Sequence, residues 1–149
     1  MTTPPPTAPS PLQRALEKAQ RDLGEFFLDA FTALNVNGIS GDGTLLLMHD
    51  DTTNRCSDGR GRVAAKTWHQ LALLDAGSWH SPAYAGEPIP TYWRVAKYCI
   101  ANGVMLNAEI KPCIGRERET GAAVALETQA LFSAPEHAHL KPLLSSFST

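Results

Sequence analysis

The sequence predicts an α/β fold in which parallel strands alternate with helices. Two short segments, residues 45–48 and 106–111, have the composition of strands, and polar side chains that include His49 and Glu109 lie at their carboxyl ends. Segments with the apolar spacing and the capping residues of helices lie between and after these strands. This alternation is typical of parallel sheets, in which functional side chains gather at the carboxyl ends of the strands.

The length and composition describe one globular domain. The 149 residues are 43 % hydrophobic and 19 % charged, and a formal net charge of −2 provides no broad positive field for nucleic acid. No apolar run approaches the roughly 20 residues of a membrane helix, so no membrane span is predicted. The sequence shows no secretory signal, and its three cysteines lack the spacing of a disulfide framework or a zinc site. A cytoplasmic location is therefore predicted.

The first part of the chain divides into a proline-rich tail and a helical segment. Five of the eleven prolines fall within the first eleven residues, which predicts that residues 1–10 are disordered. From Pro11 onward, apolar residues recur at spacings of three and four. An amphipathic helix is predicted over 11–34, so that residues 11–39 form a helical start to a folded region that spans 11–149.

Three further helices and a last strand complete the predicted order. Thr67 and Gln70 have the spacing of a capping box, and Thr91 caps a second helix that Asn102 and Gly103 end. A third helix is predicted over residues 120–132, and a strand over 142–147. The second helix bears Trp93, Ala96 and Ile100, and the residues predicted for the buried side of the third helix are Ala123, Leu126, Ala130 and Leu131.

The strand over residues 106–111 is the best defined of the predicted strands. Its alternation puts apolar residues on one face and polar residues on the other. One face is expected to pack on helices, and the other to carry chemistry or to face water. The apolar face consists of Leu106, Ala108 and Ile110, and the polar face of Asn107, Glu109 and Lys111.

Five segments occur in the order and spacing of the glycerophosphodiester phosphodiesterase family, which the chain resembles over residues 40–149. The resemblance is greatest to the small bacterial cytoplasmic members. It implies a partial TIM-type (β/α) barrel that hydrolyses glycerophosphodiesters to glycerol 3-phosphate and an alcohol, with a divalent cation and two histidines as general acid and base. The five segments are Ser40-Gly41-Asp42-Gly43, His49-Asp50-Asp51, Leu74-Asp75-Ala76-Gly77-Ser78-Trp79, Gly86-Glu87-Pro88-Ile89-Pro90 and Glu109-Ile110-Lys111-Pro112.

The resemblance assigns roles to three residues. His49 matches one of the two catalytic histidines, Glu109 matches a metal ligand, and Lys111 is placed to meet a phosphate oxygen. Such groups suit the reaction, because hydrolysis of an anionic diester benefits from a hard cation such as Mg²⁺ or Ca²⁺ and from proton transfer near neutral pH. The structural alternatives are a loop histidine, an ion pair between Glu109 and Lys111, and capping or turn roles for Asp50 and Asp51.

In the family, the segments over residues 52–61 and 75–90 form a small cover over the substrate. The first segment is polar and rich in glycine, which predicts flexibility. Trp79 and Tyr84 of the second segment are candidates for contact with the glycerol or alcohol end of a substrate, and packing within the cover is the alternative.

The chain departs from the family pattern at two motifs. Family members open with a strand that ends in a His-Arg-Gly tripeptide, which provides the second catalytic histidine and a phosphate-binding arginine, and no such tripeptide occurs in this sequence. A Glu-x-Asp pair completes the metal site of the family. Counting back from Ser40 places Leu34 and Val36 at those two positions, and a slip of one residue offers Asn35 and Asn37. These are poor ligands for a hard cation, so Mg²⁺ or Ca²⁺ is expected to bind weakly, if at all.

Length is the third departure, because a TIM barrel usually needs about 250 residues. Two interpretations stay open. The chain is a fragment or altered reading of a phosphodiesterase gene, incomplete at both ends, with impaired hydrolysis. Alternatively, it is a short protein that kept half a barrel and lost catalysis, and serves as an interaction module with the helix over 11–34 as its contact surface. The uncovered edges and apolar face of a half-barrel favour self-association.

Overall fold

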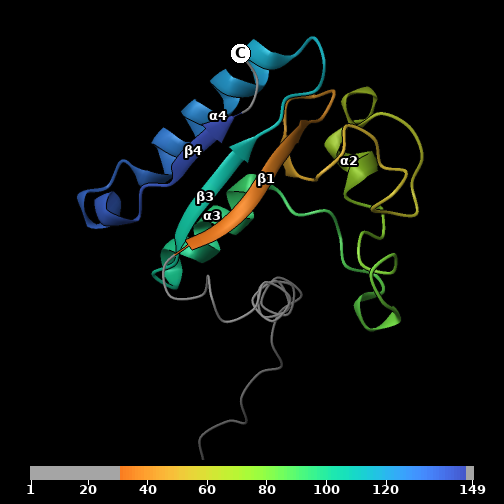
Figure 1. The fold of residues 1–149 in the computed structure, drawn as a ribbon, viewed down its shortest axis with the longest axis horizontal. Helices are drawn as coiled ribbons and strands as arrows, with labels where there is room; N and C mark the ends of the chain where they lie inside the picture. The colour runs from red at the N-terminus through yellow and green to blue at the C-terminus, as the bar shows by residue number, and fades with distance from the viewer. Residues whose placement is uncertain (1–30, 147–149) are drawn as a thin grey trace, which may run out of the picture.

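The computed structural model describes residues 31–146 of the chain. Four strands form one sheet in the order β2-β1-β3-β4, and helices α3 and α4 pack against it (Figure 1). The strands are β1 (Phe31–Ile39), β2 (Leu45–Leu47), β3 (Met105–Ile110) and β4 (Leu143–Ser146). The helices are α2 (Trp68–Leu71), α3 (Tyr92–Ala101) and α4 (Glu117–Phe132), and the 3₁₀ turns are η2 (Val63–Ala65), η3 (Pro82–Tyr84) and η4 (Pro135–Leu140).

The main core lies between one face of the sheet and the helices α3 and α4. Leu106 and Ala108 of β3 are buried there, which confirms the alternation predicted for this strand. Tyr92 of α3 and Val124 of α4 are fully buried in the same cluster, and Tyr92 Oη lies 2.7 Å from Thr128 Oγ1 of α4. The opposite face of β3 is therefore left for its polar side chains.

Residues 31–39 form strand β1, although the sequence predicted a helix over 11–34 and a helical start over 11–39. The predicted helix is wrong over residues 31–34, where the backbone pairs in parallel with β3. β1 lies between two other strands, and such pairing overrides a helical periodicity that depends on spacing alone. The rest of the predicted helix and the predicted tail over residues 1–10 lie outside the described residues.

The connection between β1 and β2 is a hairpin, so the parallel arrangement predicted for the strand over residues 45–48 is wrong. β2 pairs antiparallel with β1, because the five residues that join them are too few for a parallel crossover. Ser40 Oγ donates to Asp42 Oδ1 at 2.5 Å and accepts from the backbone N–H of Thr44 at 2.8 Å. Gly43 has a φ of 93°, which favours glycine. The Ser-x-Asp-Gly motif therefore builds this turn.

The remaining strands have the predicted arrangement. β3 pairs in parallel with β1 on one side and with β4 on the other. β4 lies within the predicted range of residues 142–147. The described residues thus form a mixed α/β sheet, with three parallel strands and one antiparallel edge strand, and they do not close into a barrel.

Helices α3 and α4 occupy the predicted parts of the chain, but α4 exposes two residues predicted to be buried. Leu126 is 67 % exposed and Ala130 is also exposed, and Trp93 of α3 is 42 % exposed. The reason is that each helix rotates to place the side chains that fit the sheet in the core, and a count of apolar residues does not determine that rotation. The buried residues are Tyr92, Val95, Ala96 and Cys99 of α3, and Thr120, Val124, Leu131 and Phe132 of α4, so the burial predicted for Leu131 is confirmed. Among residues 31–146, no helix combines the length and the apolar character needed to cross a membrane.

Residues 52–90 form a cover that packs on β2. Thr67 and Gln70 form the predicted capping box at the start of α2, with the backbone N–H of Thr67 donating to Gln70 Oε1 at 3.0 Å. The backbone N–H of Trp68 donates to Asp42 Oδ1 at 2.9 Å, which fastens α2 to the hairpin turn. The cover shares a small core with β2, made by Leu46, Met48, Val63, Leu71 and Ile89.

One carboxylate and one glycine hold the segment over residues 74–79. Asp75 Oδ1 accepts from the backbone N–H groups of Gly77 and Ser78 at 2.8 and 2.9 Å, and Asp75 Oδ2 accepts from Ser78 Oγ at 2.5 Å. These hydrogen bonds, the side-chain one above all, hold the pKa of the Asp75 carboxyl well below its usual range. A Cβ atom on Gly77 would lie 1.8 Å from the carbonyl oxygen of Tyr84. Only glycine fits this position.

Gly77→Ala is therefore expected to lower the free energy of unfolding by about 1–3 kcal/mol, the usual cost of overpacking. Gly121→Ala in α4 is the matched control, because no atom lies within 4 Å of its Cβ position. Replacing a helical glycine with alanine is expected to stabilise the protein by about 0.5–1 kcal/mol. Urea unfolding followed by circular dichroism measures both values. Equal effects of the two substitutions would contradict the close approach at Gly77.

Candidate functional site

His49 and Lys111 meet at one end of the sheet, although 62 residues separate them in the sequence. β2 ends at Leu47, the next residue is buried, and His49 then lies exposed at the start of the following loop. Lys111 follows the last residue of β3, and its backbone N–H donates to the carbonyl oxygen of Val36 at 3.2 Å. Lys111 Nζ lies 3.4 Å from His49 Nε2. The structure therefore brings together the residues predicted for proton transfer and for phosphate binding.

Glu109 joins this pair through Lys111. Glu109 Oε1 lies 3.4 Å from Lys111 Nζ, so the ion pair between these two residues is present. The Lys111 ammonium has three donors, and two of them face Glu109 and His49. Both Glu109 and Lys111 are partly exposed, so an anionic ligand can approach the ammonium.

Asp50 binds His49 on the other side of the imidazole. His49 Nδ1 lies 2.8 Å from Asp50 Oδ1. Arg55 donates to the same carboxylate through two N–H groups on one edge of its guanidinium, from Nε to Oδ2 at 2.8 Å and from Nη2 to Oδ1 at 2.7 Å. The Arg55 guanidinium and then the His49 ring hold the pKa of the Asp50 carboxyl well below its usual range. Asp50 is therefore a charged partner of His49.

Sequence reasoning did not select Arg55, and it interpreted Asp50 as a turn or capping residue. No spacing rule connects an arginine to a histidine six residues earlier when the loop between them has no regular structure. The available signal was a long cationic side chain in the polar loop over residues 52–61, which the resemblance already placed near the substrate. Asp51 lies at a bend of the chain, and its carbonyl oxygen accepts from the backbone N–H of Val63 at 2.9 Å, which links this loop to η2.

The backbone register shows which residue of β1 lies beside Glu109. Asn35, and not Leu34 or Val36, is the Cα partner of Glu109. Val36 is fully buried in the core, away from the polar face of β3. The pairing of β1 with β2 is irregular just after Val36, and such a bulge shifts the alternation of faces in a way that counting along the sequence does not detect. The register favours Asn35 and Asn37 at the Glu-x-Asp positions.

A divalent cation needs more oxygen ligands than this cluster offers. Among the residues that the structure describes, no group of three or more His, Cys, Asp or Glu side chains is arranged to hold a metal ion. Glu109 is paired with the ammonium of Lys111, and both oxygens of Asp50 accept from Arg55. Because Ca²⁺ takes six to eight oxygen ligands, the described residues do not fit a hard cation.

The first loop of the cover has contacts of its own, and the flexibility predicted for it stays a prediction. Thr53 is fully buried, and Ser57 Oγ donates to the carbonyl oxygen of Thr53 at 2.7 Å. The aromatic candidates lie in the second segment, where the ring of His80 stacks on Tyr84 with 5.6 Å between centroids and lies 5.7 Å from Trp79. Figure 1 shows η3, which contains Tyr84, well apart from the end of β3. The geometry therefore favours packing within the cover for these aromatic residues.

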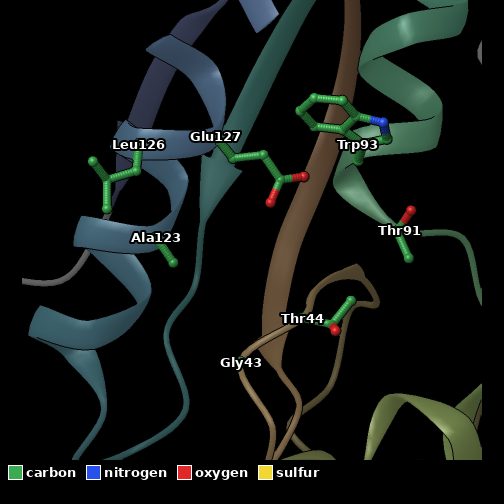
Figure 2. A pocket seen from close by; sticks show the side chains of 7 residues that line it. All are labelled: Gly43, Thr44, Thr91, Trp93, Ala123, Leu126 and Glu127. Atoms are coloured by element: carbon green, nitrogen blue, oxygen red, sulfur yellow. The ribbon is translucent and has the colours of Figure 1, made fainter. Parts of the chain in front are cut away.

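An open groove of about 490 Å³ lies between α3, α4 and the turn that joins β1 to β2 (Figure 2). The Glu127 side chain of α4 points across it toward the exposed ring of Trp93. Burial raises the pKa of the Glu127 carboxyl. The groove is on the helical side of the sheet, whereas Glu109 and Lys111 are on the other face, so it is separate from the His49 cluster. Its lining residues are Gly43, Thr44, Thr91, Trp93, Ala123, Leu126 and Glu127.

The described fold, a mixed α/β sheet that does not close into a barrel, matches part of solved phosphodiesterases that have TIM-type barrels. A solved structure of an Oleispira antarctica phosphodiesterase in complex with the product sn-glycerol-3-phosphate matches it with a TM-score of 0.71 at 35 % identity. Residues 39–147 match the glycerophosphoryl diester phosphodiesterase family. The chain therefore belongs to this family. Members of the family typically use a divalent metal, which the described residues do not accommodate.

The chain spans less than half the length of these relatives. It covers 47 % of the Oleispira chain, and 81 % of this chain is matched. The glycerophosphodiester phosphodiesterase of Caldanaerobacter subterraneus is 37 % identical over 70 residues, which are 47 % of this chain and 29 % of that protein. YhdW of Bacillus subtilis, which has a provisional glycerophosphodiester phosphodiesterase name, is 39 % identical over 82 residues, or 54 % of this chain and 34 % of that protein.

Cation binding by this chain is expected to be no tighter than about millimolar, the weak end of the calcium range. Glu109 is the one carboxylate that the family pattern supplies. The positive charge of the nearby Lys111 ammonium repels a metal cation and so weakens its binding to Glu109. Isothermal titration with Ca²⁺ and with Mg²⁺ measures the affinity. Micromolar binding that disappears in Glu109→Gln would show that further ligands complete the site.

Proposed function

We propose that the chain carries a glycerophosphodiester-hydrolysing site in which His49 transfers protons and Lys111 binds the phosphate. Glu109 is the proposed ligand for a weakly held Mg²⁺ or Ca²⁺, and no step of the proposal passes through that ion. The observation that carries the proposal is the 3.4 Å approach of Lys111 Nζ to His49 Nε2 from two distant parts of the chain. A cytoplasmic location remains the prediction from the sequence.

The two side chains suit the two demands of phosphodiester hydrolysis. The ammonium of Lys111 neutralises charge on a non-bridging oxygen of the phosphate. The imidazole of His49 exchanges a proton with the attacking water or with the leaving oxygen, which a histidine can do near neutral pH. The substrate class follows from the family and from the Oleispira relative, whose structure holds sn-glycerol-3-phosphate.

Hydrolysis by this chain alone is expected to be slow. The sequence contains no His-Arg-Gly tripeptide, which supplies the second histidine in the family. Loss of one proton-transfer group commonly lowers the rate by about 10²- to 10⁴-fold. Release of glycerol 3-phosphate from glycerophosphocholine, measured beside the Caldanaerobacter enzyme, is expected to be at least about 10²-fold slower.

His49→Ala is the control for this assay. A residual rate that falls further in His49→Ala supports proton transfer by His49. A rate equal to that of His49→Ala removes the claim of activity and leaves the family membership intact. A rate equal to that of the Caldanaerobacter enzyme would contradict the expected impairment.

Binding of the product tests Lys111 without requiring turnover. Titration of the ¹⁵N-labelled chain with sn-glycerol 3-phosphate is expected to shift the NMR signals of residues around His49 and Lys111. Lys111→Gln is expected to weaken binding about tenfold, because a hydrogen bond to a charged group contributes at least about that factor. Lys141→Gln removes the same charge from an exposed position after η4. Equal affinities in the two variants would rule out the role of Lys111.

A non-catalytic interaction module is the second candidate, and strand β4 favours it, because among residues 31–146 this strand pairs only with β3. All four residues of β4 are exposed, and Leu143 and Leu144 are 56 % and 39 % exposed. An exposed edge strand offers backbone groups that can pair with another chain. The helix predicted over residues 11–34 lies mostly outside the described residues, so β4 carries this candidate.

Sedimentation velocity over a range of concentrations is expected to show self-association that Leu144→Lys weakens. A charge on an edge strand discourages pairing with a second strand. Leu126→Lys is the matched control, because it changes an exposed leucine of α4 away from this edge. A monomer at all concentrations, or equal effects of the two substitutions, would contradict association through β4.

A further inference from the structure

We propose that Arg55, acting through Asp50, holds His49 in the tautomer that carries its proton on Nδ1 and turns Nε2 toward Lys111. The inference deepens the role proposed for His49 and rests on it. Asp50 and Arg55 are then positioning residues, which act on the reaction through the orientation of the imidazole.

Two contacts of the His49 ring favour the same tautomer. Asp50 Oδ1 only accepts, so its 2.8 Å contact with Nδ1 is a hydrogen bond when Nδ1 carries the proton. Lys111 Nζ only donates, so its 3.4 Å contact with Nε2 is a hydrogen bond when Nε2 is unprotonated. Arg55 Nη2 has two hydrogens and lies 3.3 Å from Nδ1 and 2.7 Å from Asp50 Oδ1, so its shorter contact is with the carboxylate. The shorter contact at Nδ1, which is with Asp50, therefore agrees with the contact at Nε2 on the Nδ1–H tautomer.

Arg55 fixes the plane of the carboxylate that makes this selection. A single hydrogen bond would let the Asp50 carboxylate rotate in its partly exposed loop position. The two parallel hydrogen bonds from Arg55, at 2.8 and 2.7 Å, prevent that rotation and keep Oδ1 directed at His49. The rigid fork of an arginine provides this geometry, which a lysine does not.

The tautomer determines which nitrogen takes part in proton transfer. Nδ1 keeps its proton in the hydrogen bond to Asp50. Nε2 is therefore the nitrogen that accepts a proton from water or donates one to a leaving oxygen. When Nε2 gains a proton, the imidazolium lies beside the Asp50 carboxylate, which stabilises its positive charge. Nε2 is also the nitrogen that lies next to Lys111, where the phosphate is proposed to bind.

Long-range ¹H–¹⁵N correlation spectra of the ¹⁵N-labelled chain report which ring nitrogen carries the proton. Spectra are recorded at a pH where the His49 ring is neutral, and its signals are assigned from their loss in His49→Gln. The wild-type chain is expected to show a protonated, pyrrole-type Nδ1 and an unprotonated, pyridine-type Nε2. Asp50→Ala is expected to lower the ratio of the Nδ1–H tautomer to the Nε2–H tautomer about tenfold. Arg55→Ala is expected to lower the same ratio.

Arg62→Ala is the matched control, because it removes an exposed arginine near the same loop. Arg62 Nη2 lies 3.9 Å from Asp51 Oδ2, and Asp51 is the neighbour of Asp50. The control is expected to leave the tautomer ratio at the wild-type value. An Nε2–H tautomer in the wild-type chain, or equal ratios in Arg55→Ala and Arg62→Ala, overturns the proposal. No substrate is needed, so an absence of turnover does not affect this result.

Discussion

The parallel pairing of β1 with β3 is the constraint on which the candidate site depends. This pairing leaves the carboxyl ends of both strands at the same end of the sheet. The hairpin after β1 then returns the chain, so that His49 lies beside Lys111. Arg116 stabilises this end of the sheet, because its Nη1 donates to the carbonyl oxygens of Ile39 and Ser40 at 3.2 and 3.0 Å. The start of α4 is thus fastened to the end of β1, and the loop that follows Lys111 has both ends fixed.

Much of the resemblance to the family lies in residues that shape the backbone. Asp42 links the hairpin turn to the start of α2, and Asp75 with Gly77 holds the cover in a conformation that no larger residue at position 77 permits. The hydrogen bonds of Asp42 and Asp75 hold backbone groups of α2 and of the cover in place. The family pattern therefore includes residues that shape the backbone and residues that carry the reaction. The first kind is present in this sequence, whereas the His-Arg-Gly and Glu-x-Asp motifs are not.

The sequence was most informative where a pattern is local. The alternation of β3 placed Glu109 and Lys111 on one face, and the capping box marked the start of α2. Prediction was wrong where pairing with distant residues decides the outcome. Residues 31–34 form a strand because β3 pairs with them, and the same parallel register places Asn35 beside Glu109. Arg55 was missed for the same reason, since only the folded loop brings it to the carboxylate next to His49.

The charges of the cluster limit how strongly it can hold an anion. Arg55 and Lys111 supply two positive charges, and Asp50 and Glu109 supply two negative charges, so the cluster is neutral while His49 is neutral. A proton taken up at His49 Nε2 during the reaction gives the cluster one net positive charge. A phosphodiester carries one negative charge, which the protonated cluster matches. His49 therefore sets the charge available for binding as well as the proton available for reaction.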